Sequence, residues 1–202
     1  MKNNNNNQSE IIEREYCMNN NLKSLDPIIA RILSSRGITN LEQTKYNLSS
    51  IAPISSLCNV NSAVNVLIEN MNKQIVIVGD YDVDGATSVS LLMRCLSDFG
   101  FKKINYIVPN RLRDGYGLTE DVVLDANSLN PDLLITVDNG ISSIEGVKKA
   151  RELGIDVIIT DHHLPGSKIP NANVIVNPNL ANSNFLSPNL AGVGVAFYVM
   201  AA

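Results

Sequence analysis

Short, continuous runs of β-branched and other apolar residues recur from residue 75 onward, and they constrain the fold more than any other feature. Runs of this kind are expected of strands that are buried on both faces of a parallel sheet. Segments with apolar residues at helical spacing separate the runs, and this alternation predicts an α/β fold, a parallel β-sheet flanked by helices. The predicted strands are 75–78, 104–108, 133–137, 157–160 and 174–176; the predicted helices are 63–71, 87–99, one capped by Thr119, and 143–153.

The chain before this region divides into two segments. Residues 1–24 are Asn-rich and polar with little apolar periodicity, which predicts a disordered tail. Residues 25–58 are expected to form a short helical N-terminal appendage, in which Asp26 caps a helix, Pro27 occupies its first position and Gly37 ends it. A second short helix is expected over 41–46. Residues 59–202 then make up the α/β domain.

Composition excludes several classes of protein. With 45% hydrophobic and 18% charged residues, the chain is not wholly disordered. We expect neither a membrane association nor a signal peptide, because no long uncharged apolar run is present. The three cysteines are far apart and form no C-x-x-C motif, which argues against a disulfide framework or a thiolate zinc site and favours a reducing cytoplasm. A net charge of −4 also argues against binding nucleic acid through bulk positive charge.

Acidic residues and both histidines of the chain follow three of the predicted strands. Because the carboxyl ends of parallel strands meet at one edge of a sheet, these side chains should lie together. Carboxylates crowded at one edge repel one another unless cations neutralise them, and oxygen ligands with imidazole suit Mn²⁺ or Mg²⁺. Two such ions would stabilise the attacking and leaving oxygens in phosphoester hydrolysis. The residues are Asp80, Asp82, Asp84, Asp138, Asn139, Asp161, His162 and His163.

Each of these motifs has a simpler interpretation when it is taken alone. Residues 80–85 could form a calcium loop, but the EF-hand form needs a preceding helix and Glu at position twelve, where this chain has Leu91. Residues 138–140 could form only a turn, and the two histidines could lie in a solvated loop. Because carboxylates or histidines follow all three strands, a metal site is favoured over these separate interpretations.

Two further segments could bind anions. Arg111 and Arg113 lie in a glycine-containing loop after the second strand and could hold a phosphate; the alternative is a surface loop in which Asp114 pairs with an arginine. Gly192 and Gly194 open an apolar helix whose N-terminal amides could face an anion. Close helix packing through glycine is the alternative there.

Six segments together carry a resemblance to a known family. They are 78–88, 110–118 (without 112–113), 136–141, 161–166, 177–179 and 190–197. In this order they resemble the DHH phosphoesterase superfamily and, within it, the bacterial exonucleases specific for single-stranded DNA. The resemblance covers roughly residues 25–202. It implies processive 5′→3′ hydrolysis of single-stranded DNA in repair and recombination, with two Mn²⁺ or Mg²⁺ ions as cofactors. A single-strand-binding protein and a helicase are the further partners it implies.

The resemblance also implies roles for individual residues. The implied metal ligands are Asp80, Asp82, Asp84, Asp138 and His162, with Asp138 bridging two ions. The implied catalytic residues are Asp138 and His163, with His163 near the scissile phosphate. The implied substrate-binding residues are Arg111, which would hold the 5′-terminal phosphate, Tyr116, Gly192 and Gly194. Asp161 and Asn139 would not bind metal or substrate themselves but would hold the neighbouring ligand residues in orientation.

Members of this family continue through another ligand Asp, a second domain and an OB-type fold. We therefore expect residues 59–202 to be a domain that is incomplete at its C-terminus and has little processive activity. One alternative is another DHH phosphoesterase, acting on short oligonucleotides, cyclic dinucleotides or pyrophosphate. A second alternative is an inactive remnant that binds metal or DNA. The Gly-Tyr-Gly sequence at 115–117 and residues 190–197 favour the exonucleases.

Overall fold

The computed structural model describes residue 12 and residues 15–17, 20–45 and 47–202. The chain divides into two compact units, Met1–Ile51 and Ala52–Ala202. This division lies seven residues before the boundary expected between residues 58 and 59. Most of the expected disordered tail, residues 1–24, lies outside the described residues. Within its described part, Asn20–Leu22 form a short 3₁₀ helix, η1, in which Leu22 is buried.

Among its described residues, the first unit contains one α-helix, α1 (Pro27–Ser35), and short 3₁₀ turns. Asp26 caps α1, because its side chain accepts hydrogen bonds from the amides of Ile28 and Ile29. Gly37 follows the helix with a φ of +77°, which is typical of a glycine that ends a helix. The helix expected over 41–46 is a shorter 3₁₀ turn, η2 (Leu41–Thr44); η3 (Leu48–Ser50) follows, and residue 46 lies outside the described residues.

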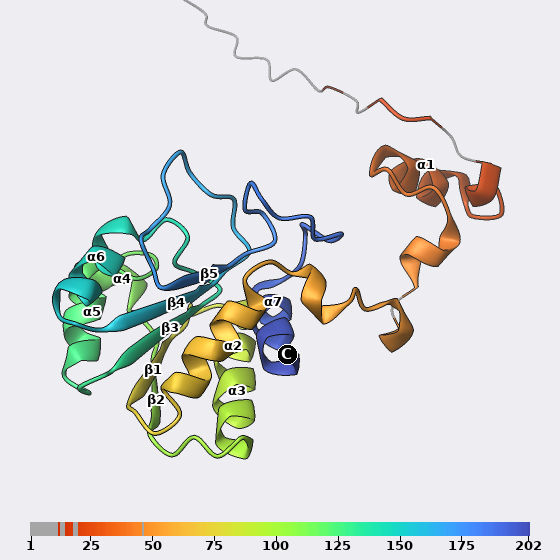
Figure 1. The fold of residues 1–202 in the computed structure, drawn as a ribbon. Helices are drawn as coiled ribbons and strands as arrows, with labels where there is room; N and C mark the ends of the chain where they lie inside the picture. Colours follow the sequence, from red (N-terminus) through yellow and green to blue (C-terminus); the bar gives the residue numbers. More distant parts are fainter. Residues whose placement is uncertain (1–11, 13–14, 18–19, 46) are drawn as a thin grey trace, which may run out of the picture. The chain divides into compact units, whose positions relative to one another are not determined.

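The second unit is built around a five-stranded parallel sheet with the order β2-β1-β3-β4-β5 (Figure 1). The strands are β1 (Ile75–Val78), β2 (Ile104–Ile107), β3 (Leu133–Val137), β4 (Asp156–Thr160) and β5 (Val174–Val176). Every residue of β1 and β3 is buried, which explains their continuous apolar sequence. The predicted α/β fold with a parallel sheet is confirmed, and each predicted strand is present.

Helices cover both faces of the sheet, with α2, α3 and α7 on one face and α5 and α6 on the other (Figure 1). The apolar core is therefore split in two: Ile75 and Ile77 of β1 pack into the first half, and Val76 and Val78 into the second. The helical segments are η4 (Ile54–Ser56), α2 (Val60–Glu69), α3 (Val83–Asp98), α4 (Arg111–Asp114), α5 (Glu120–Asn127), α6 (Ile144–Glu152) and α7 (Gly192–Ala201).

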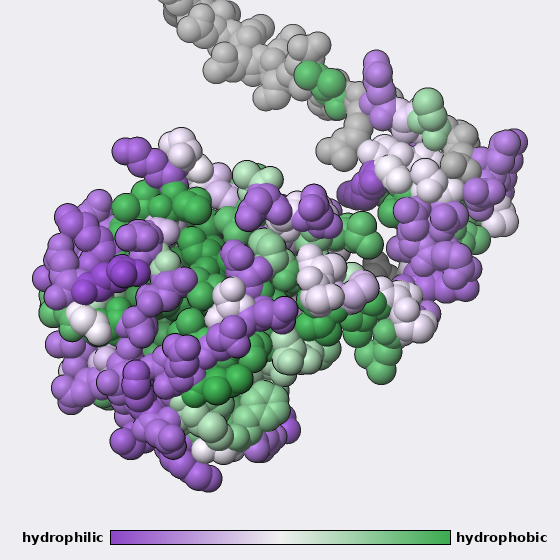
Figure 2. All heavy atoms as spheres, in the orientation of Figure 1, coloured by the Kyte–Doolittle hydropathy of each residue, from purple (hydrophilic) through white to green (hydrophobic). Residues whose placement is uncertain are grey.

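Some apolar side chains of this unit remain at the surface. In Figure 2 they are visible over α2 and α3, where Ile68, Met71 and Phe99 are exposed beside a shallow pocket. Among the described residues, no single helix is long and apolar enough to cross a membrane. One pair of helical segments, 48–56 and 60–69, passes that test together by length and composition, with a bend of 73° between them.

Helix α3 begins at Val83, four residues before the predicted start. The reason is that Asp82 acts as its N-cap, accepting a hydrogen bond of 2.9 Å from the amide of Gly85. Asp84 therefore lies in the first turn of a helix and not in a loop. A similar cap starts α4, which the sequence analysis treats as a loop: the Asn110 side chain accepts from the amide of Leu112 at 3.0 Å.

Candidate metal centre

The candidate site lies at the carboxyl ends of β1, β3 and β4. The strand order reverses between β1 and β3, because the chain runs outward from β1 to β2 and then returns to β3 on the other side of β1. Ligand sites of open parallel sheets form at this kind of switch point. Asp80 follows β1, Asp138 follows β3, and Asp161 with the two histidines follows β4. The topology thus brings the three strand ends together, as the sequence analysis expects.

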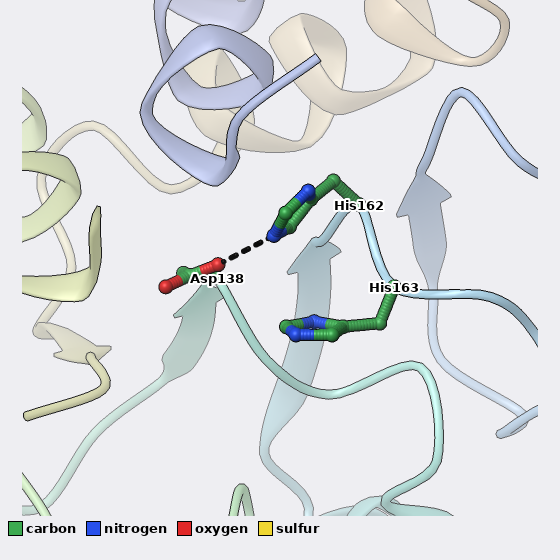
Figure 3. A group of neighbouring side chains, drawn as sticks. All are labelled: Asp138, His162 and His163. Carbon is green, nitrogen blue, oxygen red and sulfur yellow. Dashed lines mark ion pairs between the residues drawn. The ribbon is translucent and has the colours of Figure 1, made fainter. Parts of the chain in front are cut away.

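Two groups of side chains at this edge could each hold a metal ion, and they share one residue. The first group is Asp138, His162 and His163; the second is Asp80, Asp82 and Asp138. Within each group, one ligand atom per residue can be chosen so that all lie within 4.8 Å of one another. Figure 3 shows the first group, with the His162 ring directed toward Asp138. A carboxylate common to both groups is compatible with a pair of neighbouring divalent ions.

Asp138 is the residue on which both groups depend. Its side chain is buried, and its backbone has a φ of +61°, a conformation that few residues other than glycine adopt. Burial, reinforced by the charges of Asp84 and Asp82, raises the pKa of Asp138 to about 7. Its Oδ1 atom lies 3.1 Å from Nε2 of His162, yet it has no hydrogen-bond partner of acceptable geometry. A buried carboxylate oxygen without a donor fits a metal ligand, because a cation would supply the missing partner.

Asp80 and Asp82 form the β1 side of the centre. Oδ1 of Asp80 accepts a 2.7 Å hydrogen bond from the amide of Tyr81, and Asp82 is held by its capping bond to Gly85. Burial, with the neighbouring charge of Asp82, raises the pKa of Asp80. The buried carboxylate of Asp80 next to the exposed carboxylate of Asp82 favours occupation of this strand end by a cation.

Asp84 faces the N-terminal end of α7. Its two oxygens accept hydrogen bonds from the amides of Gly192 at 2.8 Å and Val193 at 2.7 Å, and Oδ2 lies 3.8 Å from Nε2 of His162. The anion in front of these amides is therefore a carboxylate of the same chain. Asp84 belongs to neither of the two groups, and its role as a ligand remains a prediction, as does substrate binding by Gly192 and Gly194.

Asp161 forms hydrogen bonds with both histidines of the site. Its buried carboxylate accepts hydrogen bonds from the amides of His162 and His163, from Nδ1 of His163 at 2.7 Å, and from the amide of Ile141. Burial opposes ionisation of Asp161, but these hydrogen bonds outweigh it and lower its pKa. The same bond to the ring raises the pKa of His163. His163 is thereby fixed in orientation and favoured in its protonated form.

Three asparagines support this edge of the sheet. Nδ2 of the buried Asn139 donates to the carbonyls of Val78 (3.2 Å) and Val137 (2.9 Å), which ties the ends of β1 and β3 together. Asn177 and Asn179 donate to the backbone carbonyls of the two histidines, at 3.0 and 2.6 Å. Asn177 and Asn179 belong to the segment 177–179 that contributes to the family resemblance, but neither was predicted as a site residue.

Two of the predicted substrate-binding residues, Arg111 and Tyr116, come from the segment that follows β2. The Tyr116 hydroxyl donates to the carbonyl of Asp138 at 3.3 Å, and it lies 3.4 Å from the His163 ring. The Arg111 guanidinium lies 4.5 Å from the centre of the Tyr81 ring. Arg113 instead pairs with Asp114 and Asp125, as the simpler interpretation of this loop proposes. Within the described part of the chain, no ion pair includes Arg111.

An open pocket of about 520 Å³ adjoins the centre. Tyr116, Asp161 and His163 line it together with the loops before α5 and α6 and the first residues of these helices. Its size is within the range typical of small-molecule sites.

We expect Asp138 to make the metal-free protein less stable as the pH rises from about 4 to about 7. In the unfolded chain its pKa has the ordinary value of 3.8, whereas in the folded protein the pKa is about 7. Protonation of Asp138 therefore makes its full contribution to the free energy of unfolding below about pH 4, and this contribution is lost above about pH 7. Thermal melts in EDTA isolate this effect by comparison with Asp138→Asn. The Tm difference between variant and wild type should grow from pH 5 to pH 8; a constant difference would contradict the raised pKa.

Comparisons with known proteins identify relatives over most of the chain. Residues 74–202 match the model of the DHH family, N-terminal domain. The single-stranded-DNA-specific exonuclease RecJ of Escherichia coli K12 is 47% identical over 180 residues, which are 88% of this chain and 31% of that protein. The protein of the same name from Haemophilus influenzae is 45% identical over 195 residues, covering 96% of this chain and 34% of that one.

A solved structure agrees with these relatives. A crystal structure of exonuclease RecJ bound to manganese superimposes with a TM-score of 0.67 and 34% identity, covering 74% of this chain and 38% of that one. The chain therefore spans about a third of the length of the curated relatives it matches. The shared region includes every residue of the candidate centre.

Proposed function

The chain belongs to the DHH family, and on that premise we propose that it supplies the metal-dependent catalytic domain of an exonuclease that degrades single-stranded DNA. The observation that carries the proposal is the pair of potential ligand groups that share the buried Asp138. Relatives with nearly half of their residues identical in this region carry the name of that activity. Because the chain spans about a third of their length, the 5′→3′ polarity and a role in DNA repair and recombination belong to the proposal as well.

The donor set supports Mn²⁺ or Mg²⁺ as the cofactor. The proposed ligands are carboxylates and the imidazole of His162, with no thiolate, which is the set that suits these cations. His163, the second imidazole of the first group, is assigned to the substrate instead. The residues proposed to hold two ions are Asp80, Asp82, Asp84, Asp138 and His162. When bound, such ions activate water and neutralise charge on the attacking and leaving oxygens of a phosphodiester.

The remaining residues of the site act on the substrate in this proposal. His163, held by Asp161 and favoured as an imidazolium, would hydrogen-bond the scissile phosphate and could donate a proton to the leaving oxygen. Arg111 would bind the 5′-terminal phosphate, since its guanidinium is supported by the Tyr81 ring and takes part in no ion pair among the described residues. The pocket beside Tyr116 and His163 has room for a nucleotide.

The cell compartment and partners are also part of the proposal. We infer a reducing cytoplasm, in keeping with three cysteines that form no disulfide. Single-stranded DNA is the partner that follows from the relatives' names. A single-strand-binding protein and a helicase are further proposed partners, by family resemblance alone.

A single-turnover nuclease assay tests the proposed function. The purified chain, in excess over 5′-labelled single-stranded DNA and supplied with Mn²⁺, should release the labelled mononucleotide. A matched duplex should be cut at least about tenfold more slowly, and Asp138→Asn should release nothing. Excess enzyme makes processivity unnecessary for detection. Equal release of the mononucleotide by the wild type and by Asp138→Asn would show that a contaminating nuclease cuts the DNA, and it would contradict the proposal.

The same assay separates the alternative functions. Preference for dinucleotides or cyclic dinucleotides over a longer strand would favour another DHH phosphoesterase. Binding of Mn²⁺ without any cleavage would favour the inactive remnant.

A further inference from the structure

The first turn of α7 contacts two carboxylates of the centre at once. The amides of Gly192 and Val193 hold the two oxygens of Asp84. A Cβ atom at position 192 would also lie 2.5 Å from Oδ1 of Asp138 and 2.8 Å from both its Cβ and its Cγ. Cβ atoms essentially never approach other atoms that closely, so the Asp138 carboxylate occupies the space that a side chain at position 192 would need.

We propose that Gly192 is a positioning residue of the metal centre, an inference that rests on the proposed metal-dependent function. Its missing side chain lets the helix end lie directly against the Asp138 carboxylate, while its amide fixes Asp84. The Oδ1 atom nearest to Gly192 is the buried oxygen without a hydrogen-bond donor, 3.1 Å from His162. A methyl group at position 192 would therefore displace the atom that the structure leaves available for a cation.

Asp138 has little freedom to avoid such a methyl group. Its side chain is buried, and its backbone is in the left-handed region at a φ of +61°, where a non-glycine residue is already strained. The backbone of Gly192 itself does not have a positive φ, so an alanine can adopt its conformation. The expected effect of Gly192→Ala is thus on the position of the carboxylate and not on the formation of α7.

Gly194 provides a matched control two residues further along the same helix. A Cβ atom there would meet the side chain of Leu190, at 2.5 Å from Cδ1 and 2.7 Å from Cγ, and Leu190 belongs to neither of the two ligand groups. Both substitutions add one methyl group to the first turn of α7. Only the change at position 192 places the methyl group against a carboxylate of the centre.

Calorimetric titration with Mn²⁺, together with thermal melts in EDTA, tests the inference. Gly192→Ala should weaken Mn²⁺ binding at least tenfold, as substitutions behind metal ligands commonly do, whereas Gly194→Ala should stay within about twofold of wild type. Binding by Gly192→Ala at wild-type affinity would overturn the inference while leaving the proposed function intact. A wild-type chain that binds no Mn²⁺ would overturn both.

A second variant covers the case in which Gly192→Ala does not fold. In the Asp138→Gly background the opposing carboxylate is absent and the positive φ is relaxed. Adding Gly192→Ala to Asp138→Gly should then leave the Tm unchanged. A loss of Tm as large as in the wild-type background would show that the methyl group acts elsewhere and would overturn the inference.

Discussion

Asp138→Asn is expected to abolish Mn²⁺ binding while stabilising the metal-free protein. The amide has the same shape, but it removes the charge that burial and the neighbouring carboxylates of Asp84 and Asp82 make unfavourable above pH 7. Asparagine also tolerates the φ of +61° at this position. At pH 8 in EDTA we expect a gain of about 1–3 kcal/mol in the free energy of unfolding, or several °C in Tm. Millimolar Mn²⁺ should raise the Tm of the wild type and leave that of the variant unchanged.

Asp98→Asn is the control for this prediction. It removes one carboxylate in the last turn of α3, the helix whose first turn carries Asp84, and Asp98 is exposed. Its Mn²⁺ response should equal that of the wild type. A Tm shift with Mn²⁺ that persists in Asp138→Asn would contradict the assignment of Asp138 to the metal centre.

Gly146→Ala is expected to destabilise the second unit by about 3 kcal/mol or more, which lowers the Tm by roughly 10 °C. Gly146 lies in α6, and a Cβ atom there would be only 1.9 Å from the carbonyl oxygen of Leu118. That oxygen is backbone and Leu118 is buried, so relief requires α6 to move away from the segment before α5. Thermal denaturation of the purified variant measures the loss.

Gly166→Ala is the matched control for Gly146→Ala. Its backbone does not have a positive φ, and the nearest atom to an added Cβ would be the carbonyl oxygen of Lys168 at 3.7 Å, an ordinary contact. This variant should remain within about 0.5 kcal/mol of wild type. A Gly146→Ala protein as stable as Gly166→Ala would contradict the close packing of α6 on residue 118.

Most of the sheet could be predicted from sequence because β1, β3, β4 and β5 are buried, whereas β2 is a partly exposed edge strand. Such strands are continuous apolar runs that stand out in a chain with 18% charged residues. The same logic predicts the gathering of Asp80, Asp138 and Asp161, since each directly follows a strand and parallel strands end at one edge. The strand order could not be predicted in this way. It depends on contacts between segments that are far apart in the sequence, and the apolar pattern of a single strand does not reveal them.

Contacts between distant segments limited the prediction of the site. Asp84 meets the amides of Gly192 and Val193, which lie 108 and 109 positions away, and no local pattern reveals that pairing. The close approach of Gly192 to Asp138 likewise depends on how α7 packs beside α3. The early start of α3 is different: Asp82, three residues before Gly85, is a readable cap, but the helix was predicted from its apolar residues to begin at residue 87.

Calorimetric titration of Mn²⁺ into the metal-free wild-type chain and into Asp138→Asn, at pH 8, tests the central claim most directly. If Asp138 is shared by two ligand groups, the wild type should bind more than one Mn²⁺ per chain and the variant should bind none at either group. Titration curves that coincide for the two proteins, or a wild type without measurable binding, would contradict a metal centre built around Asp138.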